Sequence, residues 1–343
     1  MVQASLLLAC GLAVIFTKET NALTEKVVRP SPGCGPAFQD DDFPRNKYFQ
    51  HRSLDDTREW TEFVPNSYNA SRPAPLLIYV HGQYGHATSV AQELPFSRLA
   101  SKPLITAYPQ GIDDAEGADC GTGWNVGVMG HDTSTCDAAA FTQTCCYKTC
   151  RHAGLCSGDG KDANCGWSTC LDDMAFLLEL VSTVSEELCI DLNSVYLAGG
   201  SNGGMFVHSA YAQAPDVFKS VNPVYGLPLV GHIDVPEKLT ETSIYHFHDR
   251  SDGIIPADGG LAGGWEYESA DDVLATWASL HECDEKQTRL VTPHDGGRRN
   301  AECFEHANCK TNQQVVKCMY DGNHGDWPDR GQLLLCLNGL LDG

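Results

Sequence analysis

The segment GGSNGG, residues 199–204, places Ser201 between an apolar stretch and a helix-forming stretch. Glycines around a serine permit the sharp strand-to-helix turn called a nucleophile elbow, which holds the hydroxyl exposed above a sheet. In such a turn, side chains at Gly199, Gly203 or Gly204 would collide with neighbouring backbone. We therefore interpret Ser201 as a nucleophile rather than as part of an ordinary glycine-serine turn.

A serine hydroxyl needs a base within hydrogen-bond reach, and that base needs an orienting carboxylate. In this kind of elbow the chain order is serine, acid, histidine. Downstream of Ser201, the segment HDRSDGIIP offers Asp249 and Asp252. We prefer Asp252, because a tight turn leads from it into the Ile-Ile-Pro run, and Asp249 is the alternative. A solvated turn carboxylate remains the competing interpretation.

Four histidines follow Asp252, and His324 is the predicted base. It lies in the segment NHGDWP, directly after the last predicted strand, where a loop brings an imidazole to the edge of a sheet. His281 belongs to a helix end, and His294 and His306 lie in a polar stretch. A single histidine is more often structural than catalytic, so the prediction depends on this position.

The oxyanion formed during acyl transfer needs backbone N–H donors already directed at it. The amide that follows the nucleophile, Asn202, is one candidate. The second is expected from the loop HGQYG, where we choose the Gln83 N–H and keep the Tyr84 N–H as the alternative. His81 precedes the nucleophile, which is the wrong order for the base, and is interpreted as a structural hydrogen-bonding residue.

The elements that must position these residues alternate between strands and helices. Short apolar runs predict strands at 75–80, 104–108, 194–198, 221–224, 243–247 and 315–320. Helices are predicted over 174–188, after Gly204, after the capping pair Ser269 and Asp272, and over 332–337. Asp172 and Asp173 suit the start of the first helix. This alternation predicts a mainly parallel sheet with helices on both faces, whose active site lies at the carboxyl ends of the strands.

The apolar run over 5–16, followed by Thr20-Asn21-Ala22, predicts a secretory signal peptide over 1–22, with a short membrane anchor as the alternative. The chain has 343 residues, of which 42% are hydrophobic, enough for one large core. We find no repeat and no long linker, so residues 23–343 are expected to form one catalytic domain. With 23 Lys and Arg against 45 Asp and Glu, the net charge of −22 disfavours nucleic-acid and anionic-membrane partners.

The 16 cysteines fall to 15 without the signal peptide, which indicates disulfides and at least one unpaired thiol. Eight of them lie between Cys120 and Cys170, in a segment rich in Gly, Thr, Asp and Asn. We interpret about 113–170 as a disulfide-stapled insertion. A zinc site is the alternative, but no Cys-x-x-Cys pair occurs there, and His131 and His152 lack ligand spacing. Asn69 begins the glycosylation sequon Asn-Ala-Ser.

Several of these motifs together resemble secreted feruloyl esterases and polyhydroxybutyrate-depolymerase-like esterases. In chain order over most of 32–330, the matching motifs are Cys34-Gly35, LLIYVHG, Trp124-Asn125, Asp172-Asp173, GGSNGGM, DRSDGIIP, SADDVLATWASLHEC and NHGDWP. The resemblance implies an α/β-hydrolase fold and ester hydrolysis, with Ser201, Asp252 and His324 at the triad positions. It also implies a polymer such as feruloylated or acetylated plant cell-wall polysaccharide, or a polyester, as substrate.

The expected reaction is acyl transfer through an acyl-enzyme on Ser201, which needs no metal or organic cofactor. Four aromatic residues near motif loops could stack on a phenolic acid or a sugar ring, or belong to the core: Tyr84, Trp124, Trp265 and Trp327. The competing functions are a catalytically silent protein that binds carbohydrate or protein through the Cys-rich insertion, and a serine peptidase. The sequence leaves open the natural ester, the disulfide pairing and the oligomeric state.

Overall fold

The computed structural model describes residues 28–35, 45–53, 58–100, 102–113, 121–126, 168–169, 171–231, 241–263, 265–290, 301–310 and 313–327. The predicted signal peptide, most of the Cys-rich insertion and the predicted helix at 332–337 lie outside these residues. None of the helices in the described parts of the chain has the length and apolar character that crossing a bilayer requires.

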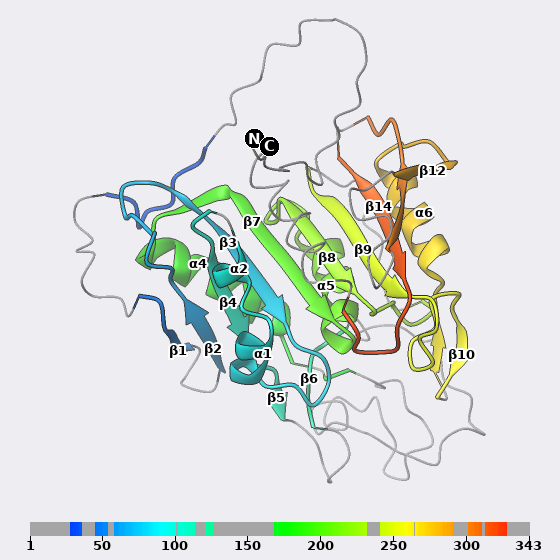
Figure 1. Cartoon of the computed structure of the whole chain (residues 1–343), viewed down its shortest axis with the longest axis horizontal. Helices are drawn as coiled ribbons and strands as arrows, with labels where there is room; N and C mark the ends of the chain where they lie inside the picture. The colour runs from blue at the N-terminus through cyan, green and yellow to red at the C-terminus, as the bar shows by residue number, and fades with distance from the viewer. Residues whose placement is uncertain are drawn as a thin grey trace, which may run out of the picture.

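The described residues are organised around a ten-stranded sheet (Figure 1). Its strands, in spatial order, are β1 (Tyr48–Ser53), β2 (Arg58–Phe63), β4 (Ile105–Pro109), β3 (Ala74–Val80), β7 (Ile190–Gly200), β8 (Ser220–Val224), β9 (Ser243–Asp249), β14 (Val315–Tyr320), β13 (Glu302–His306) and β12 (Gln287–Leu290). Neighbours from β4 to β14 pair in parallel, and antiparallel strands extend both edges. The prediction of a mainly parallel sheet is confirmed.

Helices cover both faces of the sheet, as predicted. They are α1 (Ala87–Glu93), α2 (Phe96–Leu99), α4 (Asp173–Glu187), α5 (Asn202–Gln213) and α6 (Ala270–Leu280). In β3, Leu76 and Ile78 belong to the core shared with α4, α5 and α6, whereas Leu77 and Tyr79 belong to the core shared with α1 and α2. Because successive side chains of a strand point to opposite faces, the two cores lie on opposite sides of the sheet. This explains the continuous apolar run that marked β3 in the sequence.

Two helix starts carry the caps that the sequence predicts. The Asp172 carboxylate accepts a hydrogen bond from the Ala175 N–H at 2.9 Å, and the Ser269 hydroxyl accepts one from the Asp272 N–H at 3.0 Å. Two small hairpins lie outside the main sheet: β5 (Ile112–Asp113) with β6 (Thr122–Gly123), and β10 (Gly260–Ala262) with β11 (Trp265–Tyr267).

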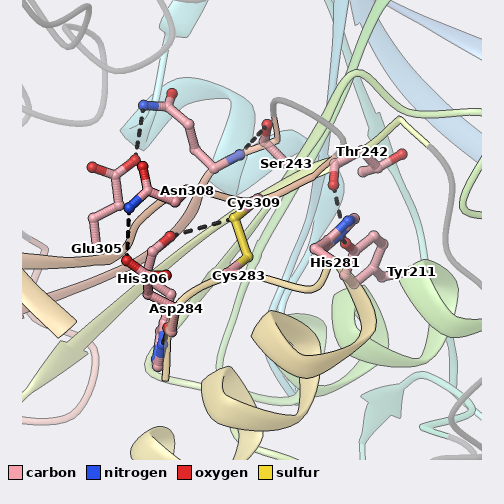
Figure 2. The surroundings of a disulfide bond; sticks show 11 residues. Tyr211, Thr242, Ser243, His281, Cys283, Asp284, Glu305, His306, Asn308 and Cys309 are labelled. Carbon is pink, nitrogen blue, oxygen red and sulfur yellow. Dashed lines mark hydrogen bonds between the residues drawn. A yellow bond between two sulfur atoms is a disulfide. The ribbon is translucent and has the colours of Figure 1, made fainter. Parts of the chain in front are cut away.

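Three disulfides join cysteines of the described residues, in line with the expected oxidised chain. Cys34–Cys189 ties the first described segment to the start of β7, and Cys303–Cys318 bridges the neighbouring strands β13 and β14. The third, Cys283–Cys309, joins the turn after α6 to the loop after β13 (Figure 2). The cysteines of the predicted insertion lie outside the described residues.

Candidate active site

Ser201 occupies the turn between β7, which ends at Gly200, and α5, which begins at Asn202. Its φ of 56° and ψ of −126° are rare for a residue with a side chain, so the turn holds backbone strain. A Cβ on Gly203 would lie 2.4 Å from two carbonyl oxygens of the β3 strand end, which excludes larger residues there. The sequence of the segment therefore follows from the close approach of α5 to β3.

A line of two hydrogen bonds connects Ser201 to an acid through an imidazole. The His324 Nε2 lies 2.9 Å from the Ser201 Oγ, and the His324 Nδ1 lies 2.8 Å from the Asp252 Oδ2. Ser201 follows the carboxyl end of β7, Asp252 follows that of β9 and His324 follows that of β14. The structure thus brings together the three side chains proposed from the sequence, at the predicted edge of the sheet.

Asp252 is held by both of its carboxylate oxygens. Its Oδ1 accepts hydrogen bonds from the Ile254 and Ile255 N–H groups, both at 2.9 Å, and its Oδ2 faces His324. Burial acts to raise the pKa of Asp252, but the hydrogen bonds from His248, His324 and the Ile255 amide outweigh it and hold that pKa well below its usual range. The carboxylate is therefore ionised at neutral pH.

The alternative acid, Asp249, has a different environment. Its Oδ1 accepts a hydrogen bond from the Ser251 N–H, and among the described residues its Oδ2 is buried without a partner. Of the two acids considered from the sequence, Asp252 is the one in contact with His324.

The loop that holds His324 is fixed by its own turn. The Asp326 N–H donates to the Asn323 carbonyl at 2.8 Å, and the Asp326 carboxylate accepts from the Asn323 N–H at 2.9 Å. The Tyr320 hydroxyl donates to the Asp326 carbonyl at 2.9 Å. The imidazole also meets the ring of Tyr225 edge-on, with 5.1 Å between centroids. These contacts leave His324 little freedom to turn away from Ser201.

Trp327, three residues after His324, packs against aromatic rings of other elements and so also holds this loop. Its ring lies 5.4 Å from that of Tyr79, 6.3 Å from that of Phe96 and 5.8 Å from that of Tyr225, measured between centroids. Trp327 therefore packs on the α1 and α2 side of the sheet. This position fits support of the His324 loop better than contact with a substrate.

The loop after β3 passes directly beside the nucleophile. A Cβ on Gly82 would lie 3.2 Å from the Ser201 Cβ, so glycine permits the close approach. The Tyr84 N–H, the alternative oxyanion donor, donates to the Thr122 carbonyl at 2.9 Å and is therefore already used in a backbone hydrogen bond. The Gln83 N–H stays the candidate from this loop, and the Asn202 N–H lies in the first turn of α5.

His81 holds this loop in place. The Gly111 N–H donates to its Nε2 at 2.9 Å, which fixes Nδ1 as the protonated nitrogen and lets it donate to the Gly82 carbonyl at 2.7 Å. Burial lowers the pKa of His81 to about 4, so the ring is neutral. Both ring nitrogens are used in holding the backbone beside Ser201, in keeping with a structural role.

The aromatic candidates differ in exposure. Trp124 is buried, stacks on Phe206 and donates its Nε1 hydrogen to the His81 carbonyl at 2.9 Å. Trp265 is partly buried against the core in β11. Tyr84 is 55% exposed, at a φ of 61°, in the loop beside Ser201. Of the four predicted aromatic contacts, Tyr84 is therefore placed best to meet a substrate.

The other histidines considered as bases have structural partners. His281 Nε2 lies 2.6 Å from the Tyr211 hydroxyl (Figure 2), and His306 Nδ1 lies 3.0 Å from the Asp284 carbonyl. His294 lies outside the described residues. Within the part of the chain that is described, no group of three His, Cys, Asp or Glu side chains is arranged to hold a metal ion.

Sequence reasoning missed one residue of the site. The His248 Nε2 lies 3.4 Å from the Asp252 Oδ2, the same oxygen that faces the His324 Nδ1. A signal was present, because His246 lies in the strand predicted at 243–247 and His248 stands two residues later, so a strand longer by one residue carries both on one face.

No family model matches the chain. Among curated proteins, it is 23% identical over 273 residues to feruloyl esterase B of Piromyces equi, a match that covers 75% of this chain and 40% of that protein. It is 26% identical over 162 residues to feruloyl esterase D of Neurospora crassa, covering 47% of this chain and 50% of that one. The chain thus spans half or less of the length of these relatives.

Among solved structures, acetyl xylan esterase from Aspergillus awamori superposes with a TM-score of 0.54 at 13% identity, over 86% of this chain and 100% of that one. At this identity the likeness bears on the fold alone. Together with the strand order and the turn at Ser201, it identifies the α/β-hydrolase fold expected from the sequence.

Proposed function

We propose that the protein is a serine carboxylic-ester hydrolase that works through an acyl-enzyme on Ser201, with His324 as base and Asp252 as the orienting acid. The observation that carries the proposal is the unbroken line from the Ser201 hydroxyl through His324 to the buried Asp252 carboxylate. The similarity to feruloyl esterases B and D supports the reaction class.

The proposed triad accounts for each proton in turn. The ionised Asp252 carboxylate can only accept, so the His324 Nδ1 carries the hydrogen and the Nε2 is left to accept the Ser201 proton. Ser201 Oγ attacks the ester carbonyl, and the leaving alcohol takes the proton back from Nε2. A water molecule then repeats both steps, which frees the acid and restores the serine.

The charge that forms on the carbonyl oxygen needs donors that are already in place. The Asn202 amide at the start of α5 and the Gln83 amide of the β3 loop are the proposed pair. Each donor of this kind contributes on the order of 3 kcal/mol of transition-state stabilisation. The helix start adds a partial positive charge at the same place.

The proposed substrate is an ester of an extracellular polymer, such as feruloylated or acetylated plant cell-wall polysaccharide or a polyester, or a small ester derived from one. The names of the similar proteins, two feruloyl esterases and an acetyl xylan esterase, support this choice. The exposed ring of Tyr84 offers a surface for an aromatic acyl group. Secretion is proposed from the apolar N-terminal run and the disulfides.

The test compares Ser201→Ala with a matched control, Ser251→Ala, which removes an exposed serine of the neighbouring β9 loop. The wild type and Ser251→Ala should hydrolyse methyl ferulate or an aryl acetate and should react with a fluorophosphonate probe, and Ser201→Ala should do neither. Turnover retained by folded Ser201→Ala would exclude the proposal. A folded wild type that the probe does not label would favour the silent binding protein, and preferential cleavage of peptide amides would favour the peptidase.

A further inference from the structure

Behind Asp252, four buried side chains form a continuous hydrogen-bonded chain that the mechanism above does not use. The Trp277 Nε1 lies 3.4 Å from the His208 Nδ1, and the His208 Nε2 lies 3.4 Å from the His246 Nδ1. The His246 Nε2 lies 3.0 Å from the His248 Nδ1. This hydrogen-bonded chain of side chains thus runs from α6 through α5 to β9 and ends beside Asp252.

The direction of this chain is fixed from both ends. The indole of Trp277 only donates, so the His208 Nδ1 accepts and its Nε2 carries the hydrogen. At the other end, the His248 Nε2 lies 2.8 Å from the Ile255 carbonyl, which only accepts, so this nitrogen also carries a hydrogen. Both ends therefore require the same neutral tautomer, with hydrogen on Nε2, in every ring along the chain.

The surroundings keep the His208 and His246 rings neutral. All three are completely buried, and this burial lowers the pKa of His208 to about 3 and that of His246 well below its usual value. Lys317 on the neighbouring strand β14 faces His246 and acts in the same direction. The group that this hydrogen-bonded chain presents to the acid is the His248 Nε2–H.

The last N–H lies at the base of the Asp252 turn. The His248 Nε2 is 2.8 Å from the Ile255 carbonyl and 3.4 Å from the Asp252 Oδ2, so a single hydrogen is shared between the two ends of that turn. The same turn is closed from inside by the Ile254 and Ile255 amides, which donate to Oδ1. His248 therefore supports the one carboxylate oxygen that backbone amides do not hold.

We propose that His248, oriented by His246, His208 and Trp277, is a positioning residue that fixes the Asp252 carboxylate toward His324. The inference rests on the proposed function. Three imidazoles buried without such a task would be costly, since apolar side chains would fill the same space without polar groups to satisfy. Among the described residues, Asp252 is the charged group of the site that this hydrogen-bonded chain meets.

The test exchanges the position of one donor. In His248→Gln the side-chain amide can place its N–H where Nε2 lies, whereas in His248→Asn it reaches only the position of Nδ1. We expect His248→Asn to lower kcat about tenfold with KM within about twofold, and His248→Gln to recover most of the loss. The matched control is the pair His281→Asn and His281→Gln, because this buried histidine bonds Tyr211 instead of the acid (Figure 2).

A second measurement determines, in the wild type, which nitrogen of each histidine in the hydrogen-bonded chain carries the hydrogen. Nitrogen-15 NMR of the imidazoles should show the hydrogen on Nε2, and not on Nδ1, in His208, His246 and His248. A folded His248→Asn with wild-type kcat, or an His248 ring protonated on Nδ1, would overturn the proposal. If His248→Asn does not fold, the NMR measurement decides. A wild type without esterase activity would instead refute the proposed function, and the tautomers would still be measured.

Discussion

Asp252→Asn is a substitution whose consequence follows atom by atom from the hydrogen bonds around the carboxylate. The Ile254 and Ile255 amides both donate to Oδ1, so the asparagine oxygen is required at that position. The amide nitrogen must then take the place of Oδ2, 2.8 Å from the His324 Nδ1. Because this nitrogen donates, it forces Nδ1 to accept and moves the imidazole hydrogen to Nε2, where the Ser201 proton has to go.

The size of the effect follows from the alternative orientation. Turning the amide to offer its oxygen to His324 would leave the two backbone N–H groups facing an NH2 group. Each lost hydrogen bond costs about 1–3 kcal/mol, so the productive orientation lies about 2–6 kcal/mol higher. At about 1.4 kcal/mol per factor of ten, kcat should fall by between about 30-fold and about 10⁴-fold, with KM little changed.

Initial rates on an aryl acetate and on methyl ferulate, with the rate of fluorophosphonate labelling, measure this prediction. Asp249→Asn is the matched control, because Asp249 is the last residue of β9, the strand that Asp252 follows, and its Oδ1 accepts from the Ser251 N–H instead of facing His324. It should keep kcat within about threefold. Asp252→Asn within tenfold of the wild type, or Asp249→Asn as damaging as Asp252→Asn, would refute the assignment of the acid.

Three further predictions concern the frame of the site. Gly203→Ala should abolish activity or folding, because the alanine Cβ would lie 2.4 Å from backbone oxygens. Gly253→Ala should be tolerated, because its Cβ would have no atom within 4 Å, and the expression level and activity of the two variants measure the difference. Burial raises the pKa of Glu62 to about 8, so this carboxyl stays protonated in the native state up to about that pH. In the unfolded chain the same carboxyl ionises above about pH 4.5, so the free energy of unfolding decreases as the pH rises from about 4.5 to 8. Glu62→Gln should therefore gain stability over the wild type with rising pH, up to about 5 kcal/mol above pH 8, in denaturant unfolding at pH 5 and 8.5. Replacing both Cys34 and Cys189 by Ser should lower the free energy of unfolding by about 4–5 kcal/mol, because the disulfide closes a loop of 155 residues. Thermal melting measures this loss of stability.

These predictions fail in distinguishable ways. Equal activity of the two glycine variants would mean that the elbow is not tightly packed. A pH-independent difference between Glu62→Gln and the wild type would mean that the native carboxyl is ionised. An unchanged melting temperature without the Cys34–Cys189 bond would mean that the bond does not constrain the unfolded chain.

The central strands were predictable because they are buried on both faces. Leu76 and Leu77 point to opposite cores, so β3 appears in the sequence as an unbroken apolar run. β4 and β8 are likewise buried at every residue, although Thr106 and Asn222 interrupt their apolar sequences. The antiparallel edge strands were not predicted. No residue of β12 is fully buried, and in β13 only Cys303 and His306 are, so polar residues such as Arg289 and Glu305 interrupt the pattern.

Element boundaries were predicted less well where packing outweighs local preference. The strand expected at 194–198 runs from Ile190 to Gly200, and the helix expected after Gly204 already begins at Asn202. Glycine disfavours helix, so the sequence suggested a later start. The two glycines are helical nonetheless because α5 must approach β3 and β8 more closely than any side chain permits.

In the site, motifs predicted the residues whose chemistry dictates their type, and tertiary contacts decided the rest. Ser201, Asp252 and His324 each follow a predicted strand, so their meeting at one edge was expected. The choice between the Gln83 and Tyr84 amides depended on Thr122, far along the chain, whose carbonyl takes the Tyr84 hydrogen. No local pattern contains such a pairing.

The strand order explains why the base must come from a loop anchored away from its own strand. The serine follows β7 and the acid follows β9, with β8 between them, so the two strands are about 10 Å apart at about 4.8 Å per strand. A serine and a carboxylate at that distance cannot share a hydrogen, and an imidazole is needed to span the gap. His324 starts one strand further away, after β14, so its loop has to cross back over β9 and β8. The packing of Trp327 on Tyr79 of β3 shows how far the loop returns. Anchoring it there places the imidazole between the two strands instead of above its own.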